Sequence, residues 1–401
     1  MKGISCQKLL ECIPDEMLEK LEQETKVNHQ TKKLTGKLLF KLFVFTLLNT
    51  ERASLRVMEE FYNSAQFKVF SGKINHKTIK HSGIAERMAH VNPDFFQAIL
   101  ETLLQEFSPL IKQKKQGVKQ DITVFDSTLV SLSSNLLKFG MRGMGKKKKN
   151  IKGGDKKQIK YTIGVKNSLP SEVKLFTEKS HLSEEIALKK AILQAEGRQE
   201  SIFVFDRGIQ RRKTFAQFSC NGIAFITRLK DRVRYKKIRI HKEVMGRRSE
   251  TLELKQDIIV QLKDETEKFM PQEFRMIVAI SLKTGEELKF LTNITALNAR
   301  EITDIYKQRW YIEMFFRFIK QELSFKHFIS RTENGIKVTL YMTMIVALLL
   351  LIYKLKNKIV GYKQAKLRFT LELEMEIIKD IVLACNGDIS QLKFHNKPHP
   401  D

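Results

Sequence analysis

The sequence has few cysteines and no apolar leader at its N-terminus, and both absences limit where the protein works. The four cysteines (Cys6, Cys12, Cys220 and Cys385) are too few and too scattered for a disulfide framework, and no two have the close spacing of a zinc motif. The N-terminus also lacks an apolar segment followed by a small-residue cleavage site, which argues against secretion. We therefore expect a protein of the reducing cytosol.

Long apolar runs are absent with one exception. Residues 338–353 are almost wholly apolar and lie between Lys337 and Lys354. This run of 16 residues is shorter than the ~20 residues that a membrane-spanning helix needs. It therefore predicts a core helix, and the alternative is a membrane anchor, which would partition with lipid on fractionation.

Acidic residues are in short supply relative to basic ones. The chain of 401 residues has 72 Lys and Arg against 45 Asp and Glu, a formal net charge of +27. A polymer of phosphates matches such an excess best, because bound cations on the polymer are released when basic side chains replace them. Nucleic acid is the expected partner, with a soluble basic protein or a ribosome-associated factor as the alternatives.

The length allows two or three domains. Residues 1–115 have a helical pattern of apolar clusters among basic and polar residues, and prolines occur there only at positions 14, 93 and 109. This region is a candidate DNA-binding module, or alternatively a helical scaffold with no specific ligand. Residues 356–401 form a basic tail that is predicted to be partly helical.

From residue 122 onwards, short β-rich runs replace the helical pattern. They cover residues 122–125, 159–165, 172–176 and 202–205, and a helix is predicted over 183–195. Three strands, a helix and a further strand are similar to the start of a ribonuclease H-like fold, a mixed sheet flanked by helices.

Two further segments belong to this region. Residues 138–160 hold ten basic residues, one acidic residue and several glycines, which indicates either a mobile arm over phosphates or a solvated loop. Residues 223–297 have uniform β texture, which predicts an antiparallel insertion before a long helix that begins near Ala299.

The most informative segment is residues 306–320. On a helix, Tyr306, Arg309, Glu313, Arg317 and Lys320 fall within an arc of about 80°. Apolar and aromatic residues fill most of the remaining circumference, so the helix should be largely buried with one polar stripe facing a site. A ladder of ion pairs between helical neighbours is the alternative explanation of the stripe.

Two aspartates follow apolar strands. Asp126 follows residues 122–125, and Asp206 follows residues 202–205, so each is predicted to close its strand at the edge of a buried sheet. Taken singly, each could be a helix cap or a turn residue. Together with Glu313 they form a set of three carboxylates, and such hard oxygen ligands favour magnesium or manganese over zinc.

Three carboxylates of this kind suit phosphodiester chemistry, in which two divalent ions activate the attacking oxygen and stabilise the leaving oxygen. Arg309 and Lys320 would then hold phosphates and offset the excess negative charge.

At these residues the chain resembles the DDE transposases of the insertion-sequence-four family. Tyr306, Arg309, Glu313 and Lys320 match every spacing of the family's Tyr-(2)-Arg-(3)-Glu-(6)-Lys pattern. The family's other blocks resemble Asp126-Ser127-Thr128, Asp206-Arg207-Gly208, residues 225–229 and residues 290–293. The resemblance covers about residues 120–355, and four spaced blocks in the right order are specific.

The resemblance implies an α/β fold with a ribonuclease H-like catalytic core, an antiparallel β insertion, and N-terminal and C-terminal helical regions. The expected division is a helical DNA-binding region at 1–115, the first part of the core at 116–222, the insertion at 223–297, the final core helices at 298–355 and the helical tail at 356–401.

The resemblance also implies a function: a transposase that binds the ends of a bacterial insertion sequence and catalyses cut-and-paste DNA cleavage and strand transfer. Asp126, Asp206 and Glu313 would bind Mg²⁺, with Mn²⁺ as the alternative ion, and Tyr306, Arg309 and Lys320 would contact DNA near the transposon end. Family members form a hairpin intermediate.

The implied partners are double-stranded DNA, as transposon ends and target, and a second copy in a homodimeric synaptic complex. The implied location is the bacterial cytoplasm at the nucleoid, without membrane association. Two other functions stay open: a non-catalytic DNA-binding protein derived from a transposase, and a metal-dependent DNA endonuclease without strand transfer.

Overall fold

The computed structural model describes residues 3–73, 76–107, 120–131, 141–142, 157–166, 169–176, 183–195, 197–323 and 329–391. The chain divides into two compact units. We call Met1–Phe107 with Phe318–Asp401 the helical unit, and Ser108–Arg317 the sheet unit. The division falls within helix α11 (Arg309–Glu322). Most of the predicted basic arm at 138–160 lies outside the described residues.

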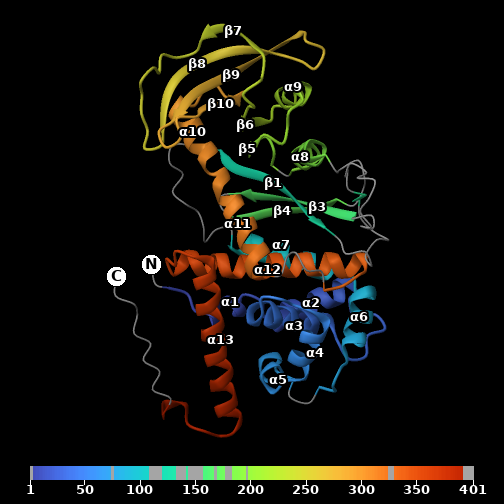
Figure 1. Ribbon diagram of the computed structural model, residues 1–401. Coiled ribbons are helices and arrows are strands. Elements are labelled where there is room, and N and C mark those ends of the chain that lie inside the picture. Colours follow the sequence, from blue (N-terminus) through green and yellow to red (C-terminus); the bar gives the residue numbers. More distant parts are fainter. Residues whose placement is uncertain are drawn as a thin grey trace, which may run out of the picture. The chain divides into compact units, whose positions relative to one another are not determined.

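The helical unit surrounds one long apolar helix, α12 (Glu333–Lys356), which contacts α3, α6, α7 and α13 (Figure 1). Its helices are α1 (Cys6–Glu11), α2 (Asp15–Thr25), α3 (Gly36–Asn49), α4 (Leu55–Asn63), α5 (Ala65–Ser71), α6 (His81–His90), α7 (Asp94–Phe107), α12 and α13 (Tyr362–Ala384), with a short 3-10 turn at Ile389–Gln391.

Helix α12 contains the apolar run of residues 338–353 but is longer than that run. It has 24 residues and begins after the cap residue Thr332, whose side chain accepts from the Gly335 N–H. Among the described helices it is the one that is long and apolar enough to cross a membrane, although 89% of its most apolar window is buried. The length argument made from the sequence was therefore wrong, whereas burial supports a core helix.

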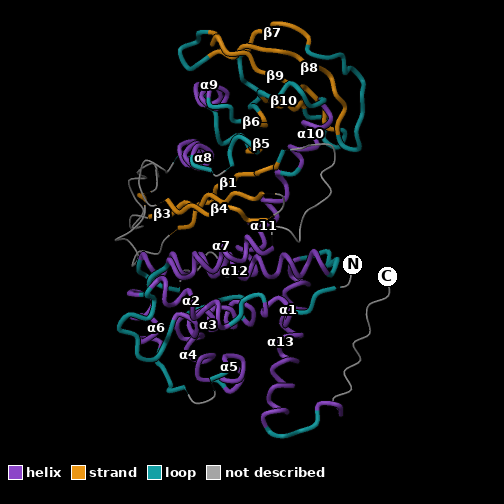
Figure 2. Tube along the Cα trace, turned by 180° about the vertical axis from the view of Figure 1, so that it is seen from behind, coloured by secondary structure: helices purple, strands orange, loops and turns teal. Residues whose placement is uncertain are grey.

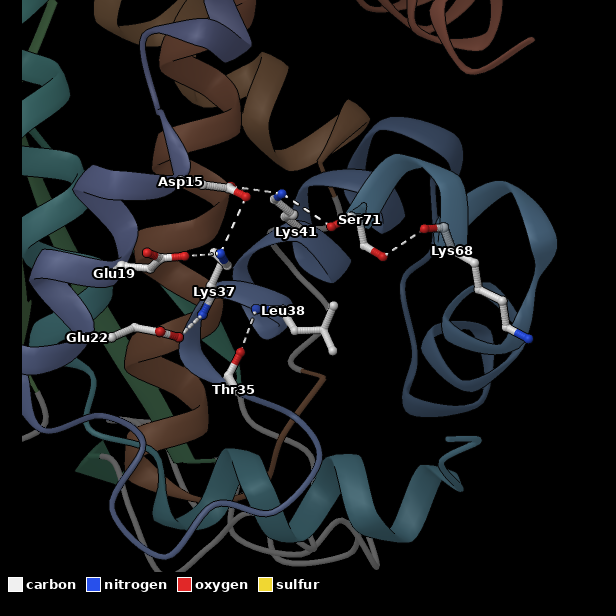
Figure 3. Close-up of polar contacts among 9 residues, drawn as sticks. All are labelled: Asp15, Glu19, Glu22, Thr35, Lys37, Leu38, Lys41, Lys68 and Ser71. Carbon is white, nitrogen blue, oxygen red and sulfur yellow. Dashed lines mark hydrogen bonds and ion pairs between the residues drawn. The ribbon is translucent and has the colours of Figure 1, made fainter. Parts of the chain in front are cut away.

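Polar contacts join α2, α3 and α5 in the helical unit (Figure 3). The Glu22 carboxylate accepts from the Lys37 N–H at 2.6 Å, at the start of α3. One helical turn later, the Lys41 ammonium lies 2.9 Å from the Asp15 carboxylate and donates to the Ser71 carbonyl oxygen at 3.3 Å. These contacts orient α3, most of whose residues are buried.

In the sheet unit, the described strands form one sheet in the order β2-β3-β1-β5-β6-β10-β9-β8-β7, with β4 also pairing with β3. Its strands are β1 (Asp121–Ser131), β2 (Met141–Arg142), β3 (Lys157–Lys166), β4 (Leu169–Phe176), β5 (Ser201–Phe205), β6 (Ala224–Arg228), β7 (Tyr235–Ile240), β8 (Leu252–Lys263), β9 (Phe269–Ser281) and β10 (Glu287–Thr292), and its helices are α8 (Glu184–Leu193), α9 (Arg212–Cys220), α10 (Ala299–Lys307) and the first part of α11. Figure 2 shows the same trace from behind.

The strand directions divide the sheet into two parts. Strands β1, β3 and β4 are antiparallel neighbours, while β5 pairs in parallel with β1 and β6 pairs in parallel with β5. From β6 onwards, β10, β9, β8 and β7 pair antiparallel throughout. The α/β class with a large mixed sheet is as predicted, and the antiparallel strands extend the same sheet.

Aromatic side chains form much of the core between these strands and α9. The ring centroids of Phe205 and Phe225 lie 6.0 Å apart, and those of Phe215 and Phe225 lie 5.4 Å apart, all in stacked geometry. Phe215 comes from α9, a helix that the sequence did not predict, and it is fully buried.

A buried ion pair fixes the segment that leads into α10. The Arg275 guanidinium on β9 donates two hydrogen bonds of 2.8 Å to the Asp257 carboxylate on β8, and both side chains are fully buried. Arg275 also donates to the carbonyl oxygens of Ile294 and Leu297 at 3.1 and 2.6 Å. The antiparallel strands thereby hold the loop directly before α10.

Candidate active site at the carboxyl edge of β1 and β5

The pairing of β1 with β5 brings the two predicted aspartates together. The parallel register ends at Val124↔Val204, and extending it by two residues places Asp126 beside Asp206. The backbones of neighbouring strands lie ~4.8 Å apart, so the extended register sets the two residues side by side just beyond the end of the β1–β5 pairing. Asp206 directly follows the last residue of β5, as predicted.

Asp126 differs from the prediction, because it does not close its strand. Strand β1 continues to Ser131, and Asp126 pairs with Ile163 of β3. The residue instead lies two positions beyond the end of the parallel pairing with β5, where the antiparallel pairing with β3 continues. The sequence could not show this, because the partner of a strand is set by residues far along the chain.

Local hydrogen bonds orient both aspartates. One Asp126 oxygen accepts from the Ser127 N–H at 2.7 Å. One Asp206 oxygen accepts from the Gly208 N–H at 2.7 Å, and this turn allows the chain to leave the strand immediately. The Thr227 hydroxyl on β6 donates to the Asp206 carbonyl oxygen at 3.0 Å, which fixes the backbone of this edge.

Helices α10 and α11 carry the other predicted site residues. Asn298 and Glu301 form a capping box at the start of α10, in which each side chain accepts from the other's backbone N–H. The long helix predicted from Ala299 is broken at Gln308, which separates α10 from α11 but keeps a helical backbone conformation. Tyr306 is the penultimate residue of the first helix, and Arg309 begins the second.

The polar stripe contains a tight ion pair. The Arg309 guanidinium donates to the Glu313 carboxylate at 2.6 Å, and it also lies 5.9 Å from the centre of the Tyr306 ring. The Tyr306 ring packs edge-on against Phe290 of β10, with centroids 5.1 Å apart. Lys320 is half-buried further along α11, in the part of that helix that belongs to the helical unit.

Electrostatics connect this stripe with Asp206. Burial raises the pKa of the Tyr306 hydroxyl, the negative charge of Asp206 raises it further, and Arg309 and Arg228 oppose the change. Burial alone would lower the pKa of Arg309. The hydrogen bond to Glu313 and the charges of Tyr306, Glu313 and Asp206 outweigh burial and raise it. Electrostatic interactions therefore connect four residues of the sheet unit: Tyr306, Arg309, Glu313 and Asp206.

The three carboxylates have suitable chemistry for a hard divalent cation, since all are oxygen donors and two are neighbours at one sheet edge. Within the described residues, no three His, Cys, Asp or Glu side chains lie close enough together to hold a metal ion. Glu313 is instead engaged by Arg309. The strand register thus places Asp126 and Asp206 just beyond the end of the β1–β5 pairing, and Arg309 interacts with both Glu313 and Asp206.

Arg228 is a site residue to which the sequence reasoning gave no role. It ends β6, beside β5, and its charge acts on the Tyr306 hydroxyl. Its guanidinium is bound to Glu286, while its Nε atom is buried without a hydrogen-bond partner. The signal was available, because a charged residue that ends an apolar strand is the same pattern that singled out Asp206.

Comparison with known proteins agrees with this architecture. Residues 117–349, more than half of the chain, match the family model for the transposase DDE domain. The chain therefore belongs to the family of transposases with a DDE domain. Such domains generally use divalent metal ions to cleave DNA.

Three curated relatives carry provisional names as transposases. The chain is 26% identical over 198 residues to a transposase of Sinorhizobium fredii, covering 49% of this chain and 52% of the relative. It is 24% identical over 274 residues to the transposase for insertion sequence element IS5377 of Geobacillus stearothermophilus, covering 67% and 66%.

The third relative is the transposase for insertion sequence element IS4SA of Synechocystis, at 25% identity over 259 residues, covering 64% of this chain and 66% of the relative. The chain thus matches about half to two thirds of the length of these relatives.

Proposed function

We propose that this protein binds the ends of a bacterial insertion sequence and catalyses DNA cleavage and strand transfer, with Asp126, Asp206 and Glu313 as the catalytic carboxylates. The observation that supports the proposal is the β1–β5 register, which ends two residues before Asp126 and Asp206, at the carboxyl edge of this parallel pairing. In open α/β sheets this edge is where ligands bind.

The strand arrangement supports a ribonuclease H-like core. Strands β4, β3 and β1 are antiparallel neighbours, β5 and β6 continue from β1 in parallel, and α8 and α9 lie between successive strands in the chain. The antiparallel insertion predicted over 223–297 would then comprise β7–β10, because β6, which lies in the same segment, pairs in parallel with β5 instead. The five-part division of the chain stays a prediction.

In this proposal Asp126, Asp206 and Glu313 would hold Mg²⁺, or Mn²⁺ in its place. Divalent ions held there supply an activated attacking oxygen and stabilise the leaving oxygen of the phosphodiester. The Arg309 guanidinium offsets the negative charge of Glu313 and Asp206, and Arg309 and Lys320 would bind DNA phosphates. Tyr306 would pack against the DNA near the transposon end.

A second copy is the proposed partner in the synaptic complex. On α13, Leu367, Leu371, Ile378 and Ile381 are exposed, although large apolar side chains are costly to leave in water. Their positions repeat with the spacing of a coiled-coil seam, and the opposite face of the helix is buried. We expect Leu371→Glu to shift the protein towards monomers in light scattering, whereas Lys363→Glu beside the seam should leave the mass unchanged.

The relatives come from bacteria, which supports a cytoplasmic location at the nucleoid. The function is tested by incubating the protein with duplex DNA that carries the inverted repeats flanking its gene, a target plasmid, and either Mg²⁺ or EDTA. We expect Mg²⁺-dependent cleavage at the repeat ends and joined products. Cleavage without joining would favour an endonuclease, and binding without cleavage would favour a non-catalytic DNA-binding protein.

A further inference from the structure

The sheet unit has a basic groove that lies apart from the predicted DNA contacts at Tyr306, Arg309 and Lys320. It is a cavity of about 570 Å³ between α8, the start of α9 and the turn that joins β8 to β9. Lys189 and Lys190 come from α8, and Arg211 and Lys213 come from the start of α9. Four cations thus line one concave surface.

Among the described residues, the two acidic side chains of the groove form no ion pair with Lys189, Arg211 or Lys213. The Glu185 carboxylate accepts from the Arg211 N–H at 2.9 Å and from the Thr214 hydroxyl at 3.3 Å. It serves as the cap of α9, whose own cap residue Arg211 forms no side-chain cap. Glu265 is exposed on the β8–β9 turn.

Three of the four cations, Lys189, Arg211 and Lys213, are available to an external anion. Within the described part of the chain, the side chains of Lys189, Arg211 and Lys213 take part in no ion pair. A hydrogen bond from Thr266 lowers the pKa of the nearby Asp264 carboxyl, and the charge of Lys213 lowers it slightly further. Cations that have no ion-pair partner in the protein can bind the phosphates of a nucleic acid and release its counterions, which favours binding.

Apolar side chains line the groove beside its cations. Ile186 is 38% exposed, and Leu193 lines the same face of α8 two helical turns further on. A lining that combines cations with apolar side chains matches a nucleic-acid backbone, in which anionic phosphates alternate with the less polar sugars. A small inorganic anion would make no contact with the apolar side chains Ile186 and Leu193.

The groove also lies near the proposed active site along the chain. Arg211 follows Asp206 after a connection of residues 207–210, so their Cα atoms are at most about 18 Å apart. That reach corresponds to about five base pairs along a duplex. A DNA segment whose scissile phosphate lay at Asp206 could therefore extend past Arg211.

We propose that this groove binds the phosphate backbone of the DNA substrate within about five base pairs of the cleaved phosphate. The proposal rests on the proposed function. It adds a DNA-binding site that is built from α8 and α9 and that acts separately from the polar stripe of α10 and α11.

The test is a salt titration of binding to a duplex that carries the element's terminal repeat. The groove variant combines Lys189→Gln, Arg211→Gln and Lys213→Gln. The matched control combines Lys236→Gln, Lys237→Gln and Lys283→Gln, which removes the same charge from exposed cations of the same unit. A charge-retaining pair, Lys189→Arg with Lys213→Arg, separates loss of charge from loss of folding.

Each lost phosphate contact should flatten the slope of log K against log salt by about 0.9, so the groove variant should lose about 2.7. A rise from 50 to 200 mM salt would then weaken wild-type binding about 40-fold more than binding by the groove variant. The charge-retaining pair should keep the wild-type slope.

Equal slopes for the groove variant and the control variant would overturn the groove proposal while leaving the proposed function intact. A wild-type protein that does not bind the duplex at all would instead refute the proposed function, so the two failures are distinguishable.

Discussion

Replacing Arg275 with methionine should destabilise the sheet unit by about 3–5 kcal/mol, because the change leaves the Asp257 carboxylate buried without its partner. The carbonyl oxygens of Ile294 and Leu297 would also lose their donor. For a unit of this size, such a loss corresponds to a fall of about 6 to 20 °C in the midpoint of thermal unfolding.

Calorimetry of three variants tests this reasoning. Arg275→Met alone should show the full loss, while Arg275→Met combined with Asp257→Leu should recover much of it, because no buried charge remains. Arg239→Met is the matched control, since its ion pair with Glu273 is just as short, at 2.6 Å, but its side chains are 58% and 38% exposed, and it should cost at most about 1 kcal/mol.

The reasoning would be refuted if Arg275→Met cost no more than Arg239→Met, or if the double variant were as unstable as the single one. A positive result would show that the antiparallel strands stabilise the whole sheet unit, of which they are part. They would also set the position of the loop before α10, and with it the position of Tyr306.

Three further predictions concern single residues. Asn298→Ala removes the cap of α10 and should cost about 1 kcal/mol in chemical denaturation. Burial opposes ionisation of Asp15, but hydrogen bonds and charges from Lys41 and Lys37 lower the pKa of its carboxyl. Its stabilisation is therefore present above the unfolded-state pKa and is lost as pH falls through the lower folded-state pKa, so Asp15→Asn should flatten acid unfolding. Burial raises the pKa of the Cys6 thiol to about 12, so iodoacetamide at pH 8 should label exposed Cys220 but label Cys6 only after unfolding.

The elements that the sequence predicts best are those with a strong local pattern. The apolar run of residues 202–205 becomes β5, buried at every position, and the predicted helix at 183–195 becomes α8. Strand β10 (Glu287–Thr292) lies within the segment 223–297, for which β structure is predicted. In each case alternation or a continuous apolar run, bounded by turn or cap residues, determines the element without help from distant residues.

What the sequence could not predict depends on pairing between distant segments. Asp126 was expected to close its strand, but β3 provides a partner beyond it, so β1 continues to Ser131. Helix α9 was missed because its apolar residues are few and its cap comes from Glu185, a residue far away in the sequence. The pairing of β10 with β6, which makes the antiparallel strands part of the same sheet, is likewise a long-range property.

The candidate site shows the same division. Helical spacing alone placed Arg309 and Glu313 on one face, and the ion pair between them follows from that spacing. The position of Asp206 relative to Asp126 depends on how β5 pairs with β1. From the sequence alone it could be inferred only through the family resemblance. The assignment of the three carboxylates and of Tyr306, Arg309 and Lys320 to catalysis and DNA contact stays a prediction.

The central claim is tested most directly by the rate of Mg²⁺-dependent cleavage of terminal-repeat DNA for Asp126→Asn, Asp206→Asn and Glu313→Gln. Asp121→Asn is the matched control, because Asp121 lies on the same strand as Asp126 at the opposite end of the parallel register and pairs with Lys166. We predict that each of the three site variants abolishes cleavage while still binding the DNA, and that Asp121→Asn cleaves at close to the wild-type rate. Wild-type cleavage by any one of the three would contradict the account.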